Sequence, residues 1–273
     1  GFVMTYSTLA AIVKYPFASS LAGKHGKFGF FCSEASTFEQ IADKLGLIRL
    51  SAPGEPLRYV RHPLVYLMEA ADDICYEIMD IEDSHKLKIL SFDETKNLLL
   101  SFFDNDTQEE ITRRLKEEGV TDENEQVVYL RACVVGKLEN ECVQTFVEHE
   151  DEILNGTFKG TLIGNISEPQ RLAYKHCSEV SFKRIYRSKP VLDIELSGYK
   201  IMETLMQSLI SAVVQPDRFH SKQIIERVSS QYDIHSDDLE TRIMAVLDYI
   251  SGMTDVYALD VYQKLCGISL PIV

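Results

Sequence analysis

The 273-residue chain carries 28 lysines and arginines against 42 aspartates and glutamates, which gives a formal net charge of −14. A protein this acidic repels polyanions at long range, so a nucleotide or nucleic acid must be held by local cations or a bound metal. No run of about 18 apolar residues is present, which argues against a membrane-spanning helix.

Six scattered cysteines without a CxxC pair favour reduced thiols in a cytoplasmic protein. The seven histidines form no HxH, HExxH or His-Asp pair, so the sequence gives no support for a self-contained histidine metal site.

Helical periodicity dominates, and no alternation of strands with helices is present, so we expect a mainly α multi-helix assembly with at most a short β element. Residues 17–33 are expected to form a loop, and residues 155–164 a glycine-punctuated turn region with room for a short strand. Predicted helix starts carry capping boxes at Ser36 with Glu39, Ser91 with Glu94, and Thr107 with Glu110. In chain order, the predicted helices cover residues 8–14, 36–45, 57–81, 92–103, 107–118, 123–154, 168–185, 192–214, 221–231, 236–251 and 254–265.

The long helix predicted at 57–81 carries two adjacent acids in its middle, and their placement is open to two interpretations. At 100° per residue, Tyr76, Asp80 and Asp83 fall about 40°, 80° and 20° from Asp72, so all four share one sector. Apolar residues fill much of the remaining circumference, which predicts burial on most sides. The acidic sector is then either a solvated face, as charge stripes commonly are, or the wall of a pocket for a metal and a polar ligand.

Five segments resemble one family in the same order. They are "TYSTLAAIVKYP" (5–16), "KFGFFCSE" (27–34), "RHPLVYLMEAADDICYEIMDIED" (61–83), "IYRSKPVLDIELSGYKI" (185–201) and "SGMTDVYALDVYQKL" (251–265). All are similar to the bacterial deoxyguanosine triphosphate triphosphohydrolases of the HD-domain superfamily. Because the segments run from one end of the chain to the other, the resemblance is far more specific than any single motif.

The resemblance implies a role for each of several residues. Asp72 corresponds to the last aspartate of an H…HD…D set that binds a divalent metal, Mn²⁺ or Mg²⁺ with iron and nickel as alternatives. Tyr76 matches a tyrosine that packs on the deoxyribose and disfavours a 2′-hydroxyl. Asp80 matches an aspartate that accepts a hydrogen bond from the sugar 3′-hydroxyl. Lys14 and Tyr15 match a "KYP" element near the phosphates, although a lysine at a helix C-terminus is equally expected from the helix dipole.

A cationic cluster at residues 183–189 is the densest in the chain. Lysines and arginines also collect at helix C-termini for dipole reasons, and that interpretation stays open. By resemblance, Tyr186 and Arg187 come from the area that the family directs towards substrate or a neighbouring subunit, so both are further candidate site residues.

The family's two histidines and its His-Asp dipeptide are absent from the sequence. We therefore expect this chain to be a fragment, with the histidines and the His-Asp dipeptide in a missing N-terminal part. By itself, the chain is expected to be inactive. Residues 1–90 would then be the C-terminal part of the HD-type catalytic core. Residues 91–273 would form a helical region packed on it without a clear linker.

The implied function of the intact protein is hydrolysis of dGTP, or another dNTP, at the α-phosphorus. A metal-activated water would release deoxynucleoside and tripolyphosphate. Two alternatives stay open: a non-catalytic helical interaction module derived from the family, and another HD-type nucleotide phosphohydrolase. The family resemblance also implies a homo-oligomer, for which a hexamer is plausible. It allows single-stranded DNA or an activating nucleotide as binding partners.

Overall fold

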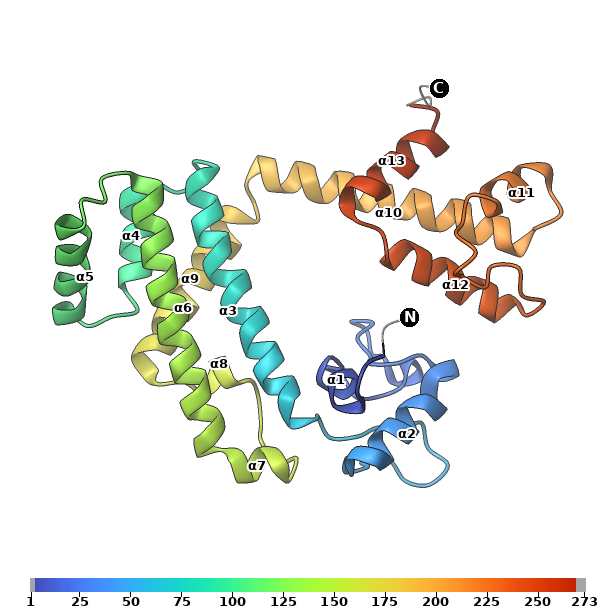
Figure 1. Cartoon of the computed structure of the whole chain (residues 1–273), viewed down its shortest axis with the longest axis horizontal. Helices are drawn as coiled ribbons and strands as arrows, with labels where there is room; N and C mark the ends of the chain where they lie inside the picture. The colour runs from blue at the N-terminus through green and yellow to red at the C-terminus, as the bar shows by residue number, and fades with distance from the viewer. Residues whose placement is uncertain (1–2, 269–273) are drawn as a thin grey trace. The chain divides into compact units, whose positions relative to one another are not determined.

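The computed structural model describes residues 3–268, and this part of the chain is mainly α-helical, as predicted (Figure 1). Within it, β structure is confined to isolated bridges. Two 3₁₀ turns (Ser19–Leu21 and Cys32–Glu34) and a π-helical turn (Ser181–Ile185) accompany the α-helices. The α-helices of the described residues are α1 (Tyr6–Ala11), α2 (Ala35–Leu45), α3 (Pro63–Lys86), α4 (Phe92–Leu100), α5 (Asn105–Glu117), α6 (Glu123–Glu148), α7 (Glu150–Leu154), α8 (Leu162–Asn165), α9 (Glu168–Val180), α10 (Lys189–Val214), α11 (Phe219–Ile225), α12 (Leu239–Ser251) and α13 (Asp255–Leu265).

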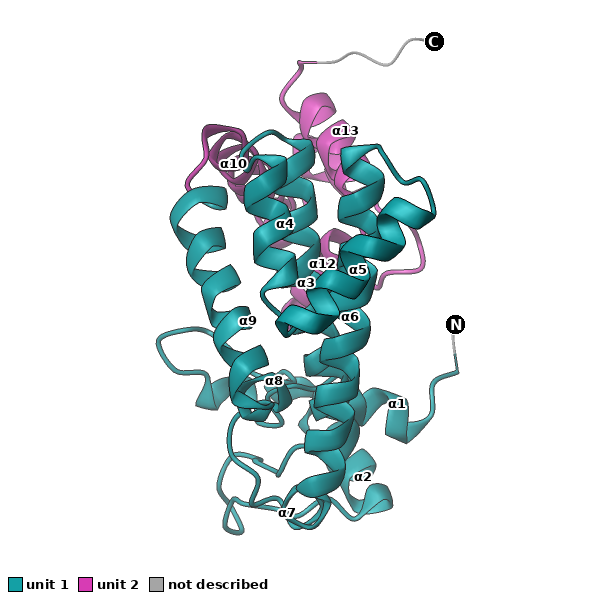
Figure 2. Cartoon of the chain, turned by 90° about the vertical axis from the view of Figure 1, so that its left-hand side faces the viewer, with its two compact units in different colours: residues 1–186 teal, residues 187–273 magenta. Residues whose placement is uncertain are grey.

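The chain divides into two compact units, the first ending at Tyr186 and the second beginning at Arg187 (Figure 2). The functional division after residue 90 that the sequence suggested concerns catalytic roles and stays a prediction. None of the helices in the described part of the chain is both long and apolar enough to cross a membrane.

The core of the first unit lies between α3 and α6, which run side by side (Figure 1). Ile74, Ile78 and Ile81 are fully or almost fully buried on α3, and they are spaced three and four residues apart, the period of a single helix face. On α6, Leu130, Val134 and Leu138 repeat every four residues and are equally buried. Helices α4, α5, α8 and α9 close this core.

The predicted start of α3 at residue 57 is wrong, because the six residues before Pro63 are not helical. Arg58 forms an antiparallel bridge with Phe17, and Tyr59 forms one with Arg49. The helix begins at Pro63, whose fixed φ suits the first helical position, and it runs on to Lys86 rather than ending at 81. Tertiary pairing of the preceding segment therefore overrides its helical periodicity.

The three predicted capping boxes had different outcomes. The pair Ser91 and Glu94 is confirmed, with Ser91 N–H donating to Glu94 Oε2 at 2.9 Å. At α5 the cap is Asp104, whose Oδ1 accepts from Thr107 N–H at 2.8 Å, so the box predicted from Thr107 is wrong. Likewise, α2 starts at Ala35 and has the predicted cap Ser36 inside it.

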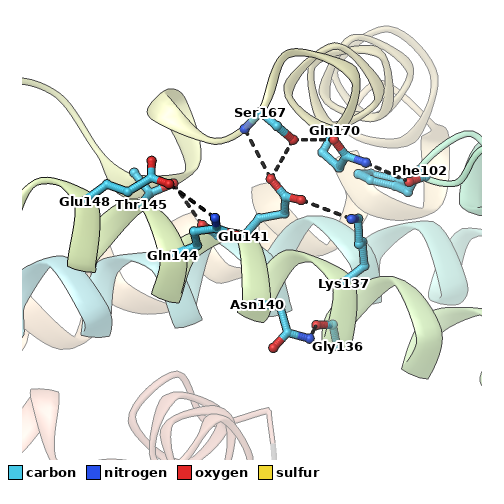
Figure 3. A network of polar contacts seen from close by, with 10 residues as sticks. All are labelled: Phe102, Gly136, Lys137, Asn140, Glu141, Gln144, Thr145, Glu148, Ser167 and Gln170. Atoms are coloured by element: carbon cyan, nitrogen blue, oxygen red, sulfur yellow. Dashed lines mark hydrogen bonds and ion pairs between the residues drawn. The ribbon is translucent and has the colours of Figure 1, made fainter.

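The segment predicted as one helix over 123–154 is broken at His149, whose φ of −109° and ψ of 18° leave the helical region, so α6 and α7 are separate. The turn region expected at 155–164 ends in the short helix α8 rather than a strand. Figure 3 shows how Glu141 of α6 fixes the start of α9: it accepts from Ser167 N–H at 3.2 Å and pairs with Lys137 at 3.0 Å.

The second unit has a core of its own, built from α10 to α13. Leu205, Leu209 and Val213 repeat at helical spacing on α10, and they pack with Val246 and Ile250 of α12 in one buried cluster. The helix predicted at 221–231 ends early, at Ile225. The helix predicted from 236 begins at Leu239, because the Asp238 carboxylate caps it by accepting from Thr241 N–H at 2.7 Å.

Acid is expected to weaken the cap of α4. The Arg184 guanidinium at 2.6 Å, together with the N–H and hydroxyl of Ser91, lowers the pKa of Glu94 to about 2. Because the folded pKa is depressed, this stabilisation is present above the usual pKa of 4.5 and is lost as pH falls through about 2. The melting-temperature difference between wild type and Glu94→Gln should therefore shrink as the pH is lowered from about 6 to about 2, a range that includes both pKa values. Glu109→Gln is the control, since the side chain of Glu109 makes no hydrogen bond or ion pair within residues 3–268. A constant difference for Glu94→Gln would contradict the assignment.

Candidate active site

The sector of α3 that carries the acids is only partly solvated. Asp72 and Tyr76 are exposed, Tyr76 to 62%, while Asp80 is half-buried. The expectation that the helix is buried on most sides is wrong in part, because Leu64 and Met79 remain 44% and 46% exposed. Helix α3 buries one face against α6 and leaves a second, mixed face with Asp72 and Tyr76 on it.

Tyr186 completes a cluster with Tyr76 and Asp80. Its hydroxyl donates to Asp80 Oδ2 at 2.7 Å, and its ring centroid lies 6.4 Å from that of Tyr76. Burial and this hydrogen bond to a carboxylate both raise the pKa of Tyr186, so its hydroxyl remains a donor. Burial also raises the pKa of Asp80, against the opposing effect of the Tyr186 bond. The structure thus unites three predicted site residues.

Lys14 lies beyond the end of α1, which stops at Ala11, so the interpretation of Lys14 as a helix-terminal residue is wrong. Its Nζ is 3.0 Å from Glu69 Oε1, and Arg61 is 2.9 Å from Glu69 Oε2. Glu69 is only 3% exposed, so one buried carboxylate holds two cations at the N-terminal end of α3. Burial alone would lower the pKa of Lys14, but the bond to Glu69 and the nearby acids raise it, so Lys14 stays charged.

A cavity of about 390 Å³ opens beside this ion cluster. Its charged lining consists of Lys14, Arg58 and Arg61, and Tyr15 contributes a ring that Lys27 covers at 5.4 Å. Further aromatic rings line it from three chain segments: Phe17, Tyr59, Tyr66 and Phe158. A concave site with an excess of cations and flat apolar walls is suited to an anionic ligand with phosphate groups.

The cationic cluster at 183–189 does not act as one group. Lys183 pairs with Glu179 at 3.4 Å, and Arg184 pairs with Glu94 on the outer side of the first unit. Arg187 is exposed and follows Tyr186 directly. Lys183 and Arg184 are therefore engaged by surface acids, and a substrate role for Arg187 stays a prediction.

The residues present do not form a metal site by themselves. Within residues 3–268, no three His, Cys, Asp or Glu side chains come together in a way that could hold a metal ion. Asp72 offers one carboxylate, so the metal implied by the resemblance would require ligands from outside these residues.

Several site residues escaped prediction from sequence. Glu69 lies near the sector of Asp72 on the helical wheel, and this position was its only sequence signal. Arg58 and Arg61 fall in a segment predicted to be helical, where no pattern distinguishes a pocket-lining arginine from a surface one. Glu77 was also missed, because its partners are far along the chain: Ser178 lies in α9 and Ser181 in the π-helical turn that follows it.

Comparison with known proteins agrees with the resemblance found in the sequence. Residues 165–264 match the phosphohydrolase-associated domain. The deoxyguanosinetriphosphate triphosphohydrolase-like protein of Pseudomonas aeruginosa is 30% identical, over 99% of this chain and 62% of its own length. Its counterpart in Synechocystis is 33% identical over 99% and 61%. The deoxyguanosinetriphosphate triphosphohydrolase of Yersinia pestis is 26% identical over 96% and 60%.

The chain therefore spans a little over three fifths of the length of these curated relatives. Sequence similarity covers both compact units, and the matched domain includes parts of each. The family resemblance is thereby confirmed: over nearly its whole length, this chain is a relative of the deoxyguanosinetriphosphate triphosphohydrolase-like proteins.

Proposed function

We propose that the whole protein is a deoxynucleoside triphosphate triphosphohydrolase acting on dGTP or another dNTP. One observation carries the proposal: α3 joins a tyrosine and aspartate cluster around Asp80 to a cation-lined cavity beside Glu69. These two acids lie eleven positions apart on the helix, a rise of roughly 16 Å. A sugar bound at one cluster would direct its phosphates towards the other.

The proposal gives each cluster a binding role. Lys14 and Tyr15 would contact the phosphates, and Arg61 would add a guanidinium that is held in place by Glu69. Asp80 would accept a hydrogen bond from the sugar 3′-hydroxyl through the oxygen that Tyr186 leaves unused. Asp72, on the same sector, would supply one ligand of a divalent metal. Since the described residues do not complete that metal site, the roles derived for this chain are binding and orientation.

Product analysis tests the proposal. The whole protein is incubated with dGTP and each other dNTP in the presence of Mn²⁺ or Mg²⁺, and the products are separated by anion exchange. Tripolyphosphate with deoxynucleoside supports the triphosphohydrolase. Inorganic phosphate would point to another HD-type phosphohydrolase, and absence of turnover to a non-catalytic module. Size-exclusion chromatography of the same preparation tests the predicted homo-oligomer.

Tyr76→Ala is expected to relax discrimination against ribonucleotides by about tenfold or more, because a pocket wall that rejects one hydroxyl by shape contributes about that much. The measurement is the ratio of kcat/KM for dGTP to that for GTP. Met79→Ala is the control, since Met79 is similarly exposed on α3 and lies outside the cluster. An unchanged ratio in Tyr76→Ala would remove its selectivity role.

A further inference from the structure

Glu77, three residues before Asp80 on α3, is a buried carboxyl group that has no cationic partner within residues 3–268. Glu77 of α3 is 6% exposed, and its two oxygens meet serine hydroxyls from another part of the chain. Ser181 Oγ is 2.7 Å from Oε1, and Ser178 Oγ is 2.8 Å from Oε2. Within residues 3–268, no lysine, arginine or histidine forms an ion pair with Glu77. An ionised carboxylate in this position would be costly to bury.

The hydrogen bonds around Glu77 are all satisfied if it is a neutral acid. Ser178 Oγ also lies 3.2 Å from the carbonyl oxygen of Tyr174, but a hydroxyl has only one hydrogen to donate. A protonated Oε2 can donate to Ser178, which then donates to Tyr174, while Ser181 donates to Oε1. Burial raises the pKa of Glu77, against the opposing effect of the two serines, which agrees with this arrangement.

Glu77 connects to the sugar site through a closed chain of contacts. Ser181 begins the π-helical turn, and its carbonyl accepts from the N–H of Tyr186 at 3.0 Å. The Tyr186 hydroxyl in turn donates a hydrogen bond to Asp80 on α3. Since Glu77 and Asp80 lie three residues apart on one helix, the acid fixes the turn that carries Tyr186. A π-helical turn is rare and often marks a functional site, and here it places a tyrosine against α3.

We propose that Glu77 is a positioning residue for sugar recognition, a buried neutral acid that holds the π-helical turn so that Tyr186 closes on Asp80. The inference rests on the proposed function, since it assigns Asp80 to the sugar. With Tyr186 bound to Oδ2, the carboxylate of Asp80 has one defined oxygen left for a sugar hydroxyl. Loss of the Glu77 contacts would release Tyr186 and leave that carboxylate free to rotate.

Three variants test the proposal: Glu77→Gln, Glu77→Ala and Ser181→Ala. Glutamine keeps a donor for Ser178 and an acceptor for Ser181, so it should reproduce the neutral acid. Ser181→Ala is the milder disruption, in case Glu77→Ala does not fold. Glu82→Ala is the matched control, because Glu82 is another buried glutamate of α3 but pairs with Arg131 at 2.7 Å and Lys86 at 2.6 Å.

Two measurements are made on the whole protein. The first follows the Tyr186 ring by NMR of ¹³C-labelled tyrosine, assigned with Tyr186→Phe. The second is calorimetric affinity for deoxyguanosine and guanosine. We expect Glu77→Gln to keep the Tyr186 resonance and the deoxyguanosine affinity within about threefold. Glu77→Ala and Ser181→Ala should shift that resonance and weaken the affinity by about tenfold or more. Glu82→Ala should change neither.

The inference is overturned if Glu77→Gln is as damaging as Glu77→Ala, which would mean that an ionised carboxylate is required. It is also overturned if the Tyr186 resonance is unchanged in both alanine variants. The proposed function fails separately: wild-type protein that binds no deoxynucleoside would remove the sugar site. In that case, a Tyr186 resonance that moves in Glu77→Ala but not in Glu77→Gln would still support the positioning of Tyr186.

Discussion

Asp72→Ala in the whole protein is expected to reduce dNTP hydrolysis by more than about 100-fold, since loss of even an outer-shell partner of a metal site costs 10–100-fold. The side chain of Asp72 is exposed and makes no hydrogen bond or ion pair within residues 3–268. Its removal should therefore leave stability unchanged within about 0.5 kcal/mol. A loss of activity in a protein of wild-type stability would assign the carboxylate to the chemistry rather than to folding.

Asp83→Ala is the matched control for this experiment. Asp83 shares the helix and the sector of Asp72, its side chain is 58% exposed, and its partner is the neighbouring Lys86 at 3.3 Å. The variant should retain wild-type turnover. Calorimetric titration with Mn²⁺ gives a readout independent of turnover, with weaker binding expected only for Asp72→Ala. Near-normal activity in Asp72→Ala would refute its assignment as a metal ligand.

Glu69→Ala should produce the largest loss of stability among the site variants, about 3 kcal/mol in the free energy of unfolding, because it leaves two cations without their shared partner. We place the loss at the lower end of the range for buried pairs, because Lys14 and Arg61 are themselves 32% and 24% exposed. Urea unfolding measures it. The pKa of Lys14, followed by NMR of its ε-carbon, should fall at the same time, because burial then acts without Glu69 to oppose it.

Glu110→Ala provides the comparison at the surface. Glu110 pairs with Arg114 one turn along α5, and both side chains are about half exposed, so the loss should stay within about 0.5 kcal/mol. Raising the salt concentration should reduce that small loss further but leave the effect of Glu69→Ala largely intact, because buried pairs are poorly screened. A loss below about 1 kcal/mol for Glu69→Ala would show that Lys14 and Arg61 find other partners.

Local patterns predicted much of the helical structure. Ser91 and Glu94 cap α4 as expected, because both partners lie within one turn, and the distant Arg184 pairs with Glu94 without displacing the cap. The boundaries failed where another segment supplied the partner. Tyr59 pairs with Arg49 in an antiparallel bridge instead of continuing a helix. At α5 the cause was local, because the carboxylate of Asp104, three residues before Thr107, already caps the first turn.

For the candidate site, the sequence determined which residues share a face of α3, since Asp72, Tyr76 and Asp80 follow from the pitch of a single helix. It also indicated the family resemblance, because five similar segments occur in the same order. Only the tertiary structure decided what that face meets. Tyr186 reaches Asp80 across 106 residues of chain, and Glu77 meets Ser181 across 104. Contacts of this kind depend on how separate helices pack, and no local periodicity encodes the pairing.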